Sequence, residues 1–356
     1  MGASGVRVGR ITDADELHAL TAEWTALADR AGARAFGYPF WCLPWLRRLG
    51  RGRPLVLTAR VGDELVGLAP FHRRGLAGAG IVRFLGHGLG AVSRLLLAPG
   101  HEGAADALWR TALPASRFAE LLEYDGNAPA LDGLGASGRR CEVRPRDVCP
   151  VIRTTGALED WWAASDSELR RVLRRAERAL DADGVSFETE LVVDPDRVGA
   201  VLPELIAIHD AAEARNPRQH FLAGRWAPFT RDLLTTAAAD GRLRLFVGRA
   251  AGRPVSFALL LLGGGSMAMW LNRFDPAFDR FSPGHLTLRA VVEAAFAEGV
   301  PEVDLLLGDA RYKRLWAQGE YRTLTVHAAT SVLVLKTGRA VLATAAVRRR
   351  RASRGR

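Results

Sequence analysis

The chain has 356 residues, more than one average domain needs and enough for two. Hydrophobic residues make up 48% and charged residues 25% of it, which is ordinary for a globular protein and excludes a chain disordered throughout. The formal net charge is +10, but the last nine residues, RRRRASRGR, hold six arginines, so the rest of the chain is only mildly basic.

The first half, residues 1–135, is predicted to form one α/β unit. Periodic apolar positions predict a helix over 13–31, and two apolar runs around Gly62-Asp63 predict a β-hairpin over 53–74. A strand, a helix and a further strand are predicted next, at 93–100, 102–113 and 118–126. The segment 136–155 is polar and rich in Arg and Pro, so we expect it to be the junction between the halves.

The second half, residues 156–330, is predicted to alternate helices and strands in the same way. The expected helices are 158–182, 197–215, 226–240 and 284–299, with a short helical turn at 310–316. The expected strands are 185–193, 243–250, 254–262, 266–274, 302–308 and 321–329. Residues 331–356 are predicted to be a C-terminal helix, to about Arg349, followed by the arginine-rich tail.

The two halves share a pattern of strand, glycine-containing turn and strand, followed by a further strand and a helix. LVLTARVGDELVGLAPF in the first half corresponds to LRLFVGRAAGRPVSFALLL in the second. This likeness predicts an internal duplication of an α/β unit.

A predicted helix start at Ser282-Pro283-Gly284 is a candidate anion site. Serine is a good N-cap, proline suits the first helical position, and glycine lets a ligand approach the backbone. The free N–H groups of a helix start attract anions. Plain helix capping explains the same residues and stays open as an alternative.

The segment EVDLLLGDARYKRLW carries a second group of candidates. Asp304 lies in an apolar strand, where a carboxylate needs either a cationic partner or a catalytic role. Lys313 is one of only two lysines, in a chain that otherwise uses arginine. This usage indicates that a compact ammonium is needed there, and a surface pair with Asp309 stays open as an alternative.

Two further groups are less specific. Asn272 shares a strand face with Trp270 and Phe274 and could bind a substrate amide or satisfy the strand end. The helix SELRRVLRRAERAL places five arginines on adjoining stripes, which could bind an acidic ligand or form a solvated helix face. Those arginines are Arg170, Arg171, Arg174, Arg175 and Arg178.

The order of these features resembles the signature block of the bacterial GNAT-superfamily acyltransferases related to FemAB, of the CelD-like, polysaccharide-biosynthesis type. The matching residues are Phe274-Asp275, Ser282-Pro283-Gly284, Gly299, Asp304, Gly308, Tyr312-Lys313 and Trp316. The resemblance spans residues 155–330 and extends more loosely to the first half, since FemAB-like proteins carry two GNAT-like units in tandem. It implies an α/β fold with a mixed sheet, tandem GNAT-like units and a FemAB-like architecture. The first unit, residues 1–135, would be degenerate and would lie on the acceptor side.

The resemblance also implies an enzyme that transfers an acetyl or other acyl group from an acyl-CoA donor to an amine or hydroxyl, with no metal. The acceptor would be a small molecule or a glycan precursor of the cell envelope. One departure is the segment RFSPG, Arg280–Gly284, which has one glycine where the GNAT pyrophosphate loop has two.

Our hypothesis assigns the candidate residues to three roles. Catalysis is assigned to Asp304 as base or orienting group, Tyr312 as proton donor and Lys313 as a phosphate or carboxylate partner. Donor binding is assigned to Asn272, Phe274, Arg280, Ser282, Gly284 and His285. Substrate binding is assigned to Arg171, Arg175, Trp270 and Trp316.

Three alternatives remain open at this point. The first is aminoacyl transfer from a charged tRNA, as in FemAB enzymes themselves. The second is a non-catalytic protein that binds a polysaccharide precursor. In the third, the arginine-rich tail binds nucleic acid or an anionic membrane surface, although a solvated, disordered tail is the interpretation we favour.

Cellular location is predicted from three features. Cys42, Cys141 and Cys149 show no metal-binding spacing and are odd in number, which favours a reducing compartment. The N-terminal segment has no apolar core of signal-peptide length, and the longest apolar stretch, 254–271, is interrupted by three glycines. We therefore expect a cytoplasmic protein without a transmembrane segment.

Overall fold

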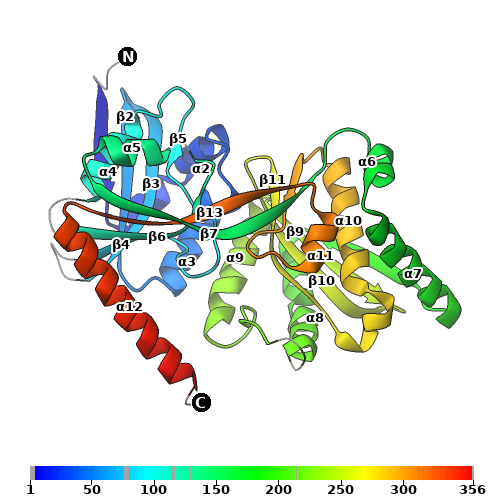
Figure 1. Ribbon diagram of the computed structural model, residues 1–356. Helices are drawn as coiled ribbons and strands as arrows, with labels where there is room; N and C mark the ends of the chain where they lie inside the picture. Colours follow the sequence, from blue (N-terminus) through cyan, green and yellow to red (C-terminus); the bar gives the residue numbers. More distant parts are fainter. Residues whose placement is uncertain are drawn as a thin grey trace. The chain divides into compact units, whose positions relative to one another are not determined.

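The computed structural model describes residues 5–75, 80–113, 117–128, 130–213, 215 and 217–354 (Figure 1). The chain divides into two compact units. Unit 1 comprises Met1–Cys42, Gly50–Asp147 and Arg322–Arg356, and unit 2 comprises Leu43–Leu49 and Val148–Tyr321. The chain passes from unit 1 to unit 2 within strand β7, Arg140–Arg153, and returns within strand β13, Gly319–Ala329.

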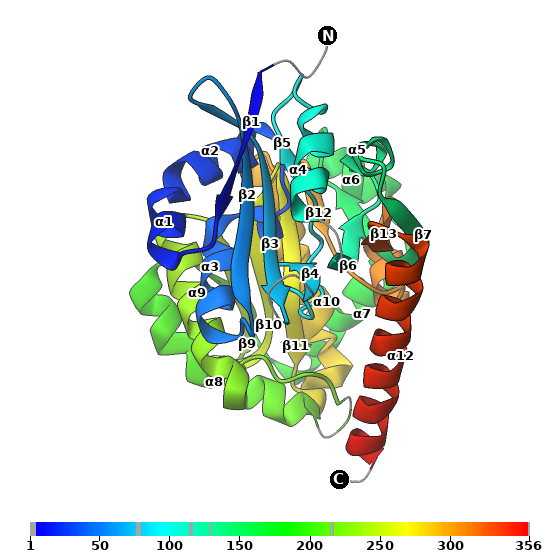
Figure 2. The same ribbon diagram turned by 90° about the vertical axis from the view of Figure 1, so that its left-hand side faces the viewer.

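Unit 1 is built on a mixed sheet. Its strands are β1 Val6–Ile11, β2 Arg53–Val61, β3 Glu64–Arg74, β4 Gly80–Phe84, β5 Leu96–Leu97, β6 Arg117–Asp125 and parts of β7 and β13. Its helices are α1 Ala14–Ala19, α2 Thr21–Arg30, the start of α3 Pro39–Arg48, α4 Ala104–Ala112, α5 Ala130–Ala136 and α12 Val332–Arg354. Helix α4 packs against β1, β2 and β3 (Figure 2).

Unit 2 is built on a second mixed sheet. Its strands are the end of β7, β8 Phe187–Val192, β9 Leu243–Ala250, β10 Arg253–Gly263, β11 Ser266–Phe274 and β12 Glu302–Asp304. Its helices are α6 Leu158–Ala164, α7 Ser167–Asp183, α8 Pro195–Glu213, α9 Ala227–Ala239, α10 Pro283–Ala297 and α11 Arg311–Trp316, with 3₁₀ turn η3 at Pro276–Phe281.

Both units pair their strands in the same order. Unit 1 runs β1-β2-β3-β4-β6-β13, and only β4 and β6 are parallel; β5 also pairs with β3. Unit 2 runs β8-β9-β10-β11-β12-β7, and only β11 and β12 are parallel. A helix connects the parallel pair in each case, α4 in unit 1 and α10 in unit 2. The mixed α/β fold with repeated units, predicted from the sequence, is confirmed.

Several predicted boundaries were wrong. Most of the predicted junction is strand β7, whose last residues, 151–153, pair with β12. Residues 322–356 belong to unit 1 instead of following unit 2. The predicted helix 158–182 is two helices, since Arg170 donates hydrogen bonds to carbonyls at the end of α6, including that of Ala163 at 3.0 Å. Helix α12 continues to Arg354, beyond the predicted Arg349; residues 355–356 of the tail lie outside the described part.

The apolar stretch that was predicted to be two strands is the β10–β11 hairpin, and its strands form the core of unit 2. Helices α7 and α10 pack on the face that carries Ala258 and Leu260. Helix α7 supplies Leu169, Leu173, Ala176 and Leu180, at the spacing of one helix face. In the part of the chain that the structure describes, no helix has the length and apolarity to cross a membrane. All three cysteines are free thiols.

Helix α10 lies so close to the sheet that β9 needs a glycine beneath it. Ser256 Oγ on β10 and Thr287 Oγ1 on α10 are hydrogen-bonded at 2.6 Å and fully buried. A Cβ at Gly248 would overlap Ser256 Oγ and lie 2.6 Å from Thr287 Oγ1. Because these neighbours are buried, the helix itself would have to move.

We therefore predict that Gly248→Ala lowers the free energy of unfolding by about 1–3 kcal/mol, measured by urea denaturation. The matched control is Gly199→Ala on the exposed face of α8, where an added Cβ meets nothing within 4 Å. That change should raise the free energy of unfolding by up to about 1 kcal/mol, through helix propensity. Equal effects of the two substitutions would contradict the close packing of α10.

Candidate functional site

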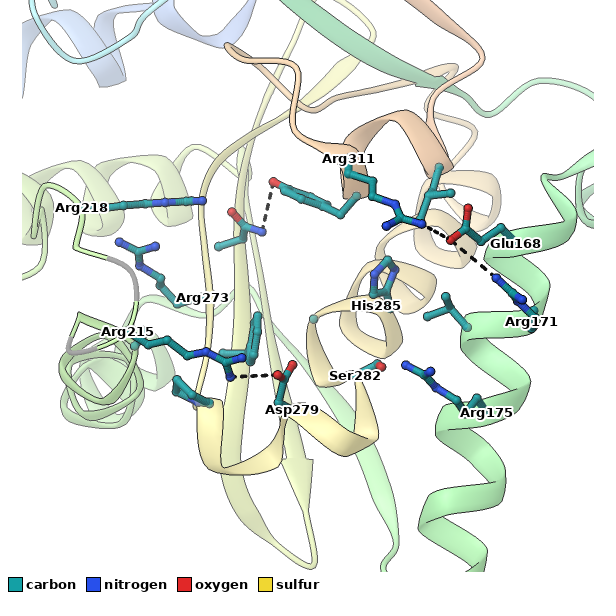
Figure 3. A pocket seen from close by; sticks show the side chains of 18 of the residues that line it. Glu168, Arg171, Arg175, Arg215, Arg218, Arg273, Asp279, Ser282, His285 and Arg311 are labelled. Carbon is teal, nitrogen blue, oxygen red and sulfur yellow. Dashed lines mark hydrogen bonds and ion pairs between the residues drawn. The ribbon is translucent and has the colours of Figure 1, made fainter.

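Unit 2 contains a pocket of about 1070 Å³ where the end of β11 meets the start of α10 (Figure 3). Residues Asn272, Arg273 and Phe274 of β11 line it, together with Ser282, Gly284 and His285 at the helix start. Helix α7, helix α11 and the segment after α8 supply the remaining walls. The pocket is of the size that binds cofactors and other small molecules.

Strand β11 is accessible here because β12 is short. Strand β12 pairs with Ser266–Ala268 only, so the rest of β11 runs beyond the end of its parallel neighbour. The register with β10 shifts at the same place: Leu259 faces Leu271 and Leu260 faces Met269, which leaves Trp270 as a bulge. The end of β11 can therefore present both side chains and main-chain groups to a ligand.

Seven arginines and only two carboxylates line the pocket. The arginines are Arg171, Arg175, Arg178, Arg215, Arg218, Arg273 and Arg311, and the acids are Glu168 and Asp279. Glu168 pairs with Arg171 at 3.8 Å and with Arg311, and Asp279 pairs with Arg215 at 2.8 Å. Among the described residues, Arg175, Arg218 and Arg273 have no carboxylate partner for their side chains. The pocket therefore favours a ligand with several negative charges.

Helix α10 starts where the sequence predicted, with Ser282 at the N-cap, but the Ser282 side chain makes no capping hydrogen bond. Ser282 adopts the left-handed conformation, φ 49° and ψ 49°, and Pro283 occupies the first turn. A Cβ at Gly284 would touch only Phe274, at an ordinary 3.4 Å, so the protein's own packing does not demand glycine there. The missing side chain instead leaves space in the pocket beside the first N–H groups of the helix.

His285 is held as a neutral ring. Its Nδ1 accepts a hydrogen bond from Trp316 Nε1 at 3.0 Å, which places the ring proton on Nε2. Burial lowers the pKa of His285, and a protonated Nδ1 would lose the bond from Trp316. His285 thus contributes a neutral N–H donor to the pocket, and Trp316 acts by orienting it; Trp316 itself is fully buried and does not line the pocket.

Tyr312 and Asn272 meet at the pocket wall. Asn272 Nδ2 donates to the Tyr312 hydroxyl at 3.4 Å. Burial raises the pKa of Tyr312, so the side chain keeps its proton at neutral pH. Both residues were predicted site residues, and the structure brings them together.

Asp304 and Lys313 lie behind the pocket instead of in it. Asp304 is fully buried; its carboxylate accepts from Leu306 N–H at 2.8 Å and from Tyr321 Oη at 2.7 Å. Lys313 Nζ donates to the carbonyl oxygens of Leu306 at 3.0 Å and Leu307 at 2.6 Å. Neither side chain lines the pocket. The catalytic roles assigned to them are not supported by this geometry, which gives both a role in holding the chain after β12.

The surroundings of Lys313 explain why a lysine occupies this position. Leu306 has φ 56°, a left-handed conformation that is unfavourable for a residue with a Cβ. Asp304 satisfies its N–H and Lys313 satisfies its carbonyl, which together hold this turn. A flexible chain with a small ammonium can reach two adjacent carbonyls in a buried space where a planar guanidinium is bulkier.

Two other predicted residues have local partners. Arg280 pairs with Asp183 and stacks over Phe281, 4.5 Å from the ring centroid. Trp270 packs against Phe221 and Phe229, on the far side of the sheet from α10. Neither Arg280 nor Trp270 lines the pocket, whereas Arg171 and Arg175 do, as predicted.

The sequence interpretation missed Arg273, Arg218, Arg215 and Arg311. Strand alternation alone assigns Arg273 to the face opposite Asn272. Both residues line the pocket because this end of β11 extends beyond the end of β12. Arg218 and Arg215 come from an irregular segment whose direction no periodicity predicts. The number of arginines near the Ser282-Pro283-Gly284 segment was the one sequence signal for these residues. The high arginine content of the whole chain obscures that signal.

A separate group, His209, Asp210 and His220, holds three potential metal ligands close together. The two rings stack with centroids 3.7 Å apart and planes 18° from parallel, and His220 Nε2 lies 2.9 Å from Asp210 Oδ1. Nitrogen lone pairs lie in the ring planes, so stacked rings aim theirs in parallel directions instead of at one point. A metal bound to both histidines would require one ring to turn.

Lys313 makes the pH dependence of stability testable. Burial lowers its pKa from 10.5 to about 8, with Cys149 and Asp304 opposing the change. Between these values the unfolded chain binds the proton and the folded chain does not, so the stability contributed at this residue rises with pH. Below pH 8 both states are protonated and the penalty is constant.

We predict that, from pH 8 to 10.5, the free energy of unfolding of the wild type rises relative to Lys313→Met by up to about 3 kcal/mol. Urea denaturation at several pH values measures the difference. Lys336→Met, which removes the exposed lysine on α12, is the control and should follow the wild type at every pH. Parallel curves for wild type and Lys313→Met would show that Lys313 does not titrate in this window.

Comparisons with known proteins agree with this fold. Residues 167–314 match the family model described as an acetyltransferase (GNAT) domain, and this segment contains the residues that line the pocket except Leu315. The search of curated proteins found no match.

Among solved structures, FemX is similar over 90% of this chain and 96% of its own, with a TM-score of 0.65 and 11% identity. The C-terminal domain of a protein described as a lysylphosphatidylglycerol synthetase, from Agrobacterium fabrum, covers 93% of this chain and 97% of its own, with a TM-score of 0.57 and 14% identity. L-PGS from Bacillus licheniformis covers 90% and 94%, with a TM-score of 0.52 and 12% identity. At these identities the likeness concerns the fold. Residues 167–314 thus match an acetyltransferase (GNAT) domain, and the chain as a whole has a fold similar to that of FemX.

Proposed function

We propose that this protein is an acyltransferase that moves an acetyl or other acyl group from an acyl-CoA thioester to an amine or hydroxyl. The observation that carries the proposal is the arginine-lined pocket between the end of β11 and the start of α10, inside the GNAT domain. The acceptor class, a sugar or another cell-envelope precursor, belongs to the proposal and rests on the sequence resemblance. A cytoplasmic location is also part of the proposal and rests on the cysteine pattern, the N-terminal segment and the interrupted apolar stretch.

The pocket suits a phosphate-bearing donor. Arg171 and Arg175 lie along α7 and face the start of α10 across the pocket (Figure 3), and Arg178 of the same helix also lines the pocket. Guanidinium groups and helix N–H groups both bind phosphate oxygens well. The Ser282–His285 turn would hold the pyrophosphate, and the α7 arginines would neutralise the remaining charge. The single glycine of this turn leaves space on the side that faces the pocket.

The transfer itself needs little from the protein beyond alignment and a proton path. The acceptor nitrogen or oxygen attacks the thioester carbonyl carbon, a C–N or C–O bond forms and the C–S bond breaks. The acceptor loses one proton, and the leaving sulfur can take up one to become the thiol. Tyr312, which keeps its proton at neutral pH, is the candidate donor to that sulfur. Main-chain N–H groups at the end of β11 are candidates to stabilise the developing oxyanion.

We predict that Arg175→Ala weakens acetyl-CoA binding at least about 10-fold, because it removes an unpaired guanidinium from the pocket. Isothermal titration calorimetry measures the change, which should shrink as salt is added. The matched control is Arg174→Ala, which changes an exposed arginine on α7 outside the pocket and should leave the affinity within about 2-fold. Absence of any acetyl-CoA binding by the wild type would reject the proposal and favour a non-catalytic binding protein.

A second prediction concerns Tyr312. Tyr312→Phe should lower kcat about 10–100-fold while the acetyl-CoA affinity changes less than about 3-fold, since the phenol acts on the leaving sulfur and not on the phosphates. Release of the CoA thiol, followed with a panel of amino sugars and amines, gives the rate. A Tyr312→Phe enzyme with unchanged kcat would show that this hydroxyl takes no part in the chemistry.

Aminoacyl transfer from a charged tRNA is the second candidate. It is favoured by the number of arginines around the pocket, which exceeds what a single CoA molecule requires. Titration with tRNA and with acetyl-CoA separates the two donors. Activity that depends on charged tRNA and ignores acetyl-CoA would replace the first proposal with the second.

A further inference from the structure

Two arginines of the pocket form a pair of like charges that the protein leaves without a counter-ion. Arg273, on β11, is only 8% exposed, and Arg218 follows α8. In Figure 3 both lie on the side of the pocket away from Arg171 and Arg175. Arg218 is close enough to lower the pKa of Arg273, after the larger effect of burial itself. The charge on each guanidinium therefore makes the charged state of the other less favourable.

The acid that acts on Arg273 is already engaged elsewhere. Glu213 exerts a favourable charge on Arg273, but its carboxylate oxygens accept from the main-chain N–H of Arg218, at 3.2 and 3.1 Å. These bonds fix the start of the Arg218 segment relative to α8. Among the described residues neither the Arg218 nor the Arg273 side chain has a hydrogen-bond or ion-pair partner. Burial disfavours the charge on Arg273, and an incoming anion would offset that effect.

The same two arginines lie next to the candidate chemistry. Both act electrostatically on Tyr312, whose hydroxyl is hydrogen-bonded to Asn272 beside Arg273 on β11. An anion held there would thus be near Tyr312 and not near the α7 arginines, which we assigned to the donor's phosphates. The pocket offers one anion site for the donor and a second that the donor does not need.

We propose that Arg218 and Arg273 bind an oxyanion of the acceptor, a carboxylate or a phosphate, so that the acceptor is an anionic amine or alcohol. This inference rests on the proposed function. It narrows the acceptor from any amine or hydroxyl compound to one with a negative group near the reacting atom. A neutral sugar or a simple diamine lacks that group.

The binding test uses the full-length protein saturated with CoA, so that the helix start is occupied. Inorganic phosphate and acetate are then titrated separately by calorimetry. We expect millimolar binding of at least one of them, weakened at least 5-fold by Arg218→Ala. The better ligand identifies phosphate or carboxylate as the preferred group. Arg225→Ala, on the same connection between α8 and α9 but outside the pocket, should leave the anion's affinity unchanged.

The turnover test compares glucosamine 6-phosphate with glucosamine, and an amino acid with its amide. We expect Arg218→Ala to lower kcat/KM at least 10-fold for the charged member of the preferred pair and less than 2-fold for the neutral member. Arg273→Gln should also lower kcat/KM for the charged member. Because Arg273 is buried, the circular dichroism spectrum and thermal midpoint of this variant are measured alongside. If Arg273→Gln does not fold, the result for Arg218→Ala, at an exposed residue, decides the test.

Two results would overturn the inference. In the first, Arg218→Ala weakens acetyl-CoA binding as much as Arg175→Ala, so that Arg218 holds the donor. In the second, phosphate and acetate both fail to bind the CoA-saturated protein. Either result leaves the acyltransferase proposal intact. Failure of the wild type to bind acetyl-CoA would reject that proposal separately.

Discussion

The pocket depends on the early end of strand β12. After Asp304 the chain turns away from β11 through Leu306, in a left-handed conformation that the Asp304 carboxylate and the Lys313 ammonium hold from either side. Because β12 stops there, β11 extends past it, and its residues Asn272 and Arg273 line the pocket. The same turn leads into α11, which directs Lys313 inward and Tyr312 to the pocket wall. The hydrogen-bonded group of Asp304, Leu306 and Lys313 thus separates β12 from β11 and leaves the end of β11 to line the pocket.

The charged side chains of the pocket differ from this buried group in how they are paired. Asp304 and Lys313 are surrounded by partners, whereas several arginines of the pocket are not. Like charges close together destabilise a folded protein, and Arg273 bears this cost while largely buried. Sites that bind polyanions commonly store such unfavourable energy and release it when the ligand arrives. The missing counter-ions are therefore informative about the ligand.

Sequence patterns predicted the elements well and the positions of side chains less well. The β10–β11 hairpin and helix α10 followed from periodicity and turn residues. Tyr312 and Asn272 were each predicted as site residues, but their contact was not predicted. Asp304 and Lys313 were expected at the site because a buried carboxylate and a rare lysine suggest chemistry. The sequence could not show that main-chain groups would be their partners, since those depend on the turn at Leu306. Arg218 was unpredictable for a related reason: it lies in a segment without periodicity.

The two units, which share one strand order, differ in charge at the corresponding helix. In unit 2 the start of α10 offers Ser282, Pro283 and Gly284 and no acid. In unit 1 the start of α4 is preceded by Glu102, whose carboxylate accepts the Gly100 N–H at 3.0 Å. Main-chain hydrogen bonds there lower the pKa of Glu102, so it is ionised and its charge occupies the region that an anionic ligand would need. The duplicated fold alone therefore does not create an anion site, and the arginines and the acid-free helix start of unit 2 account for the difference.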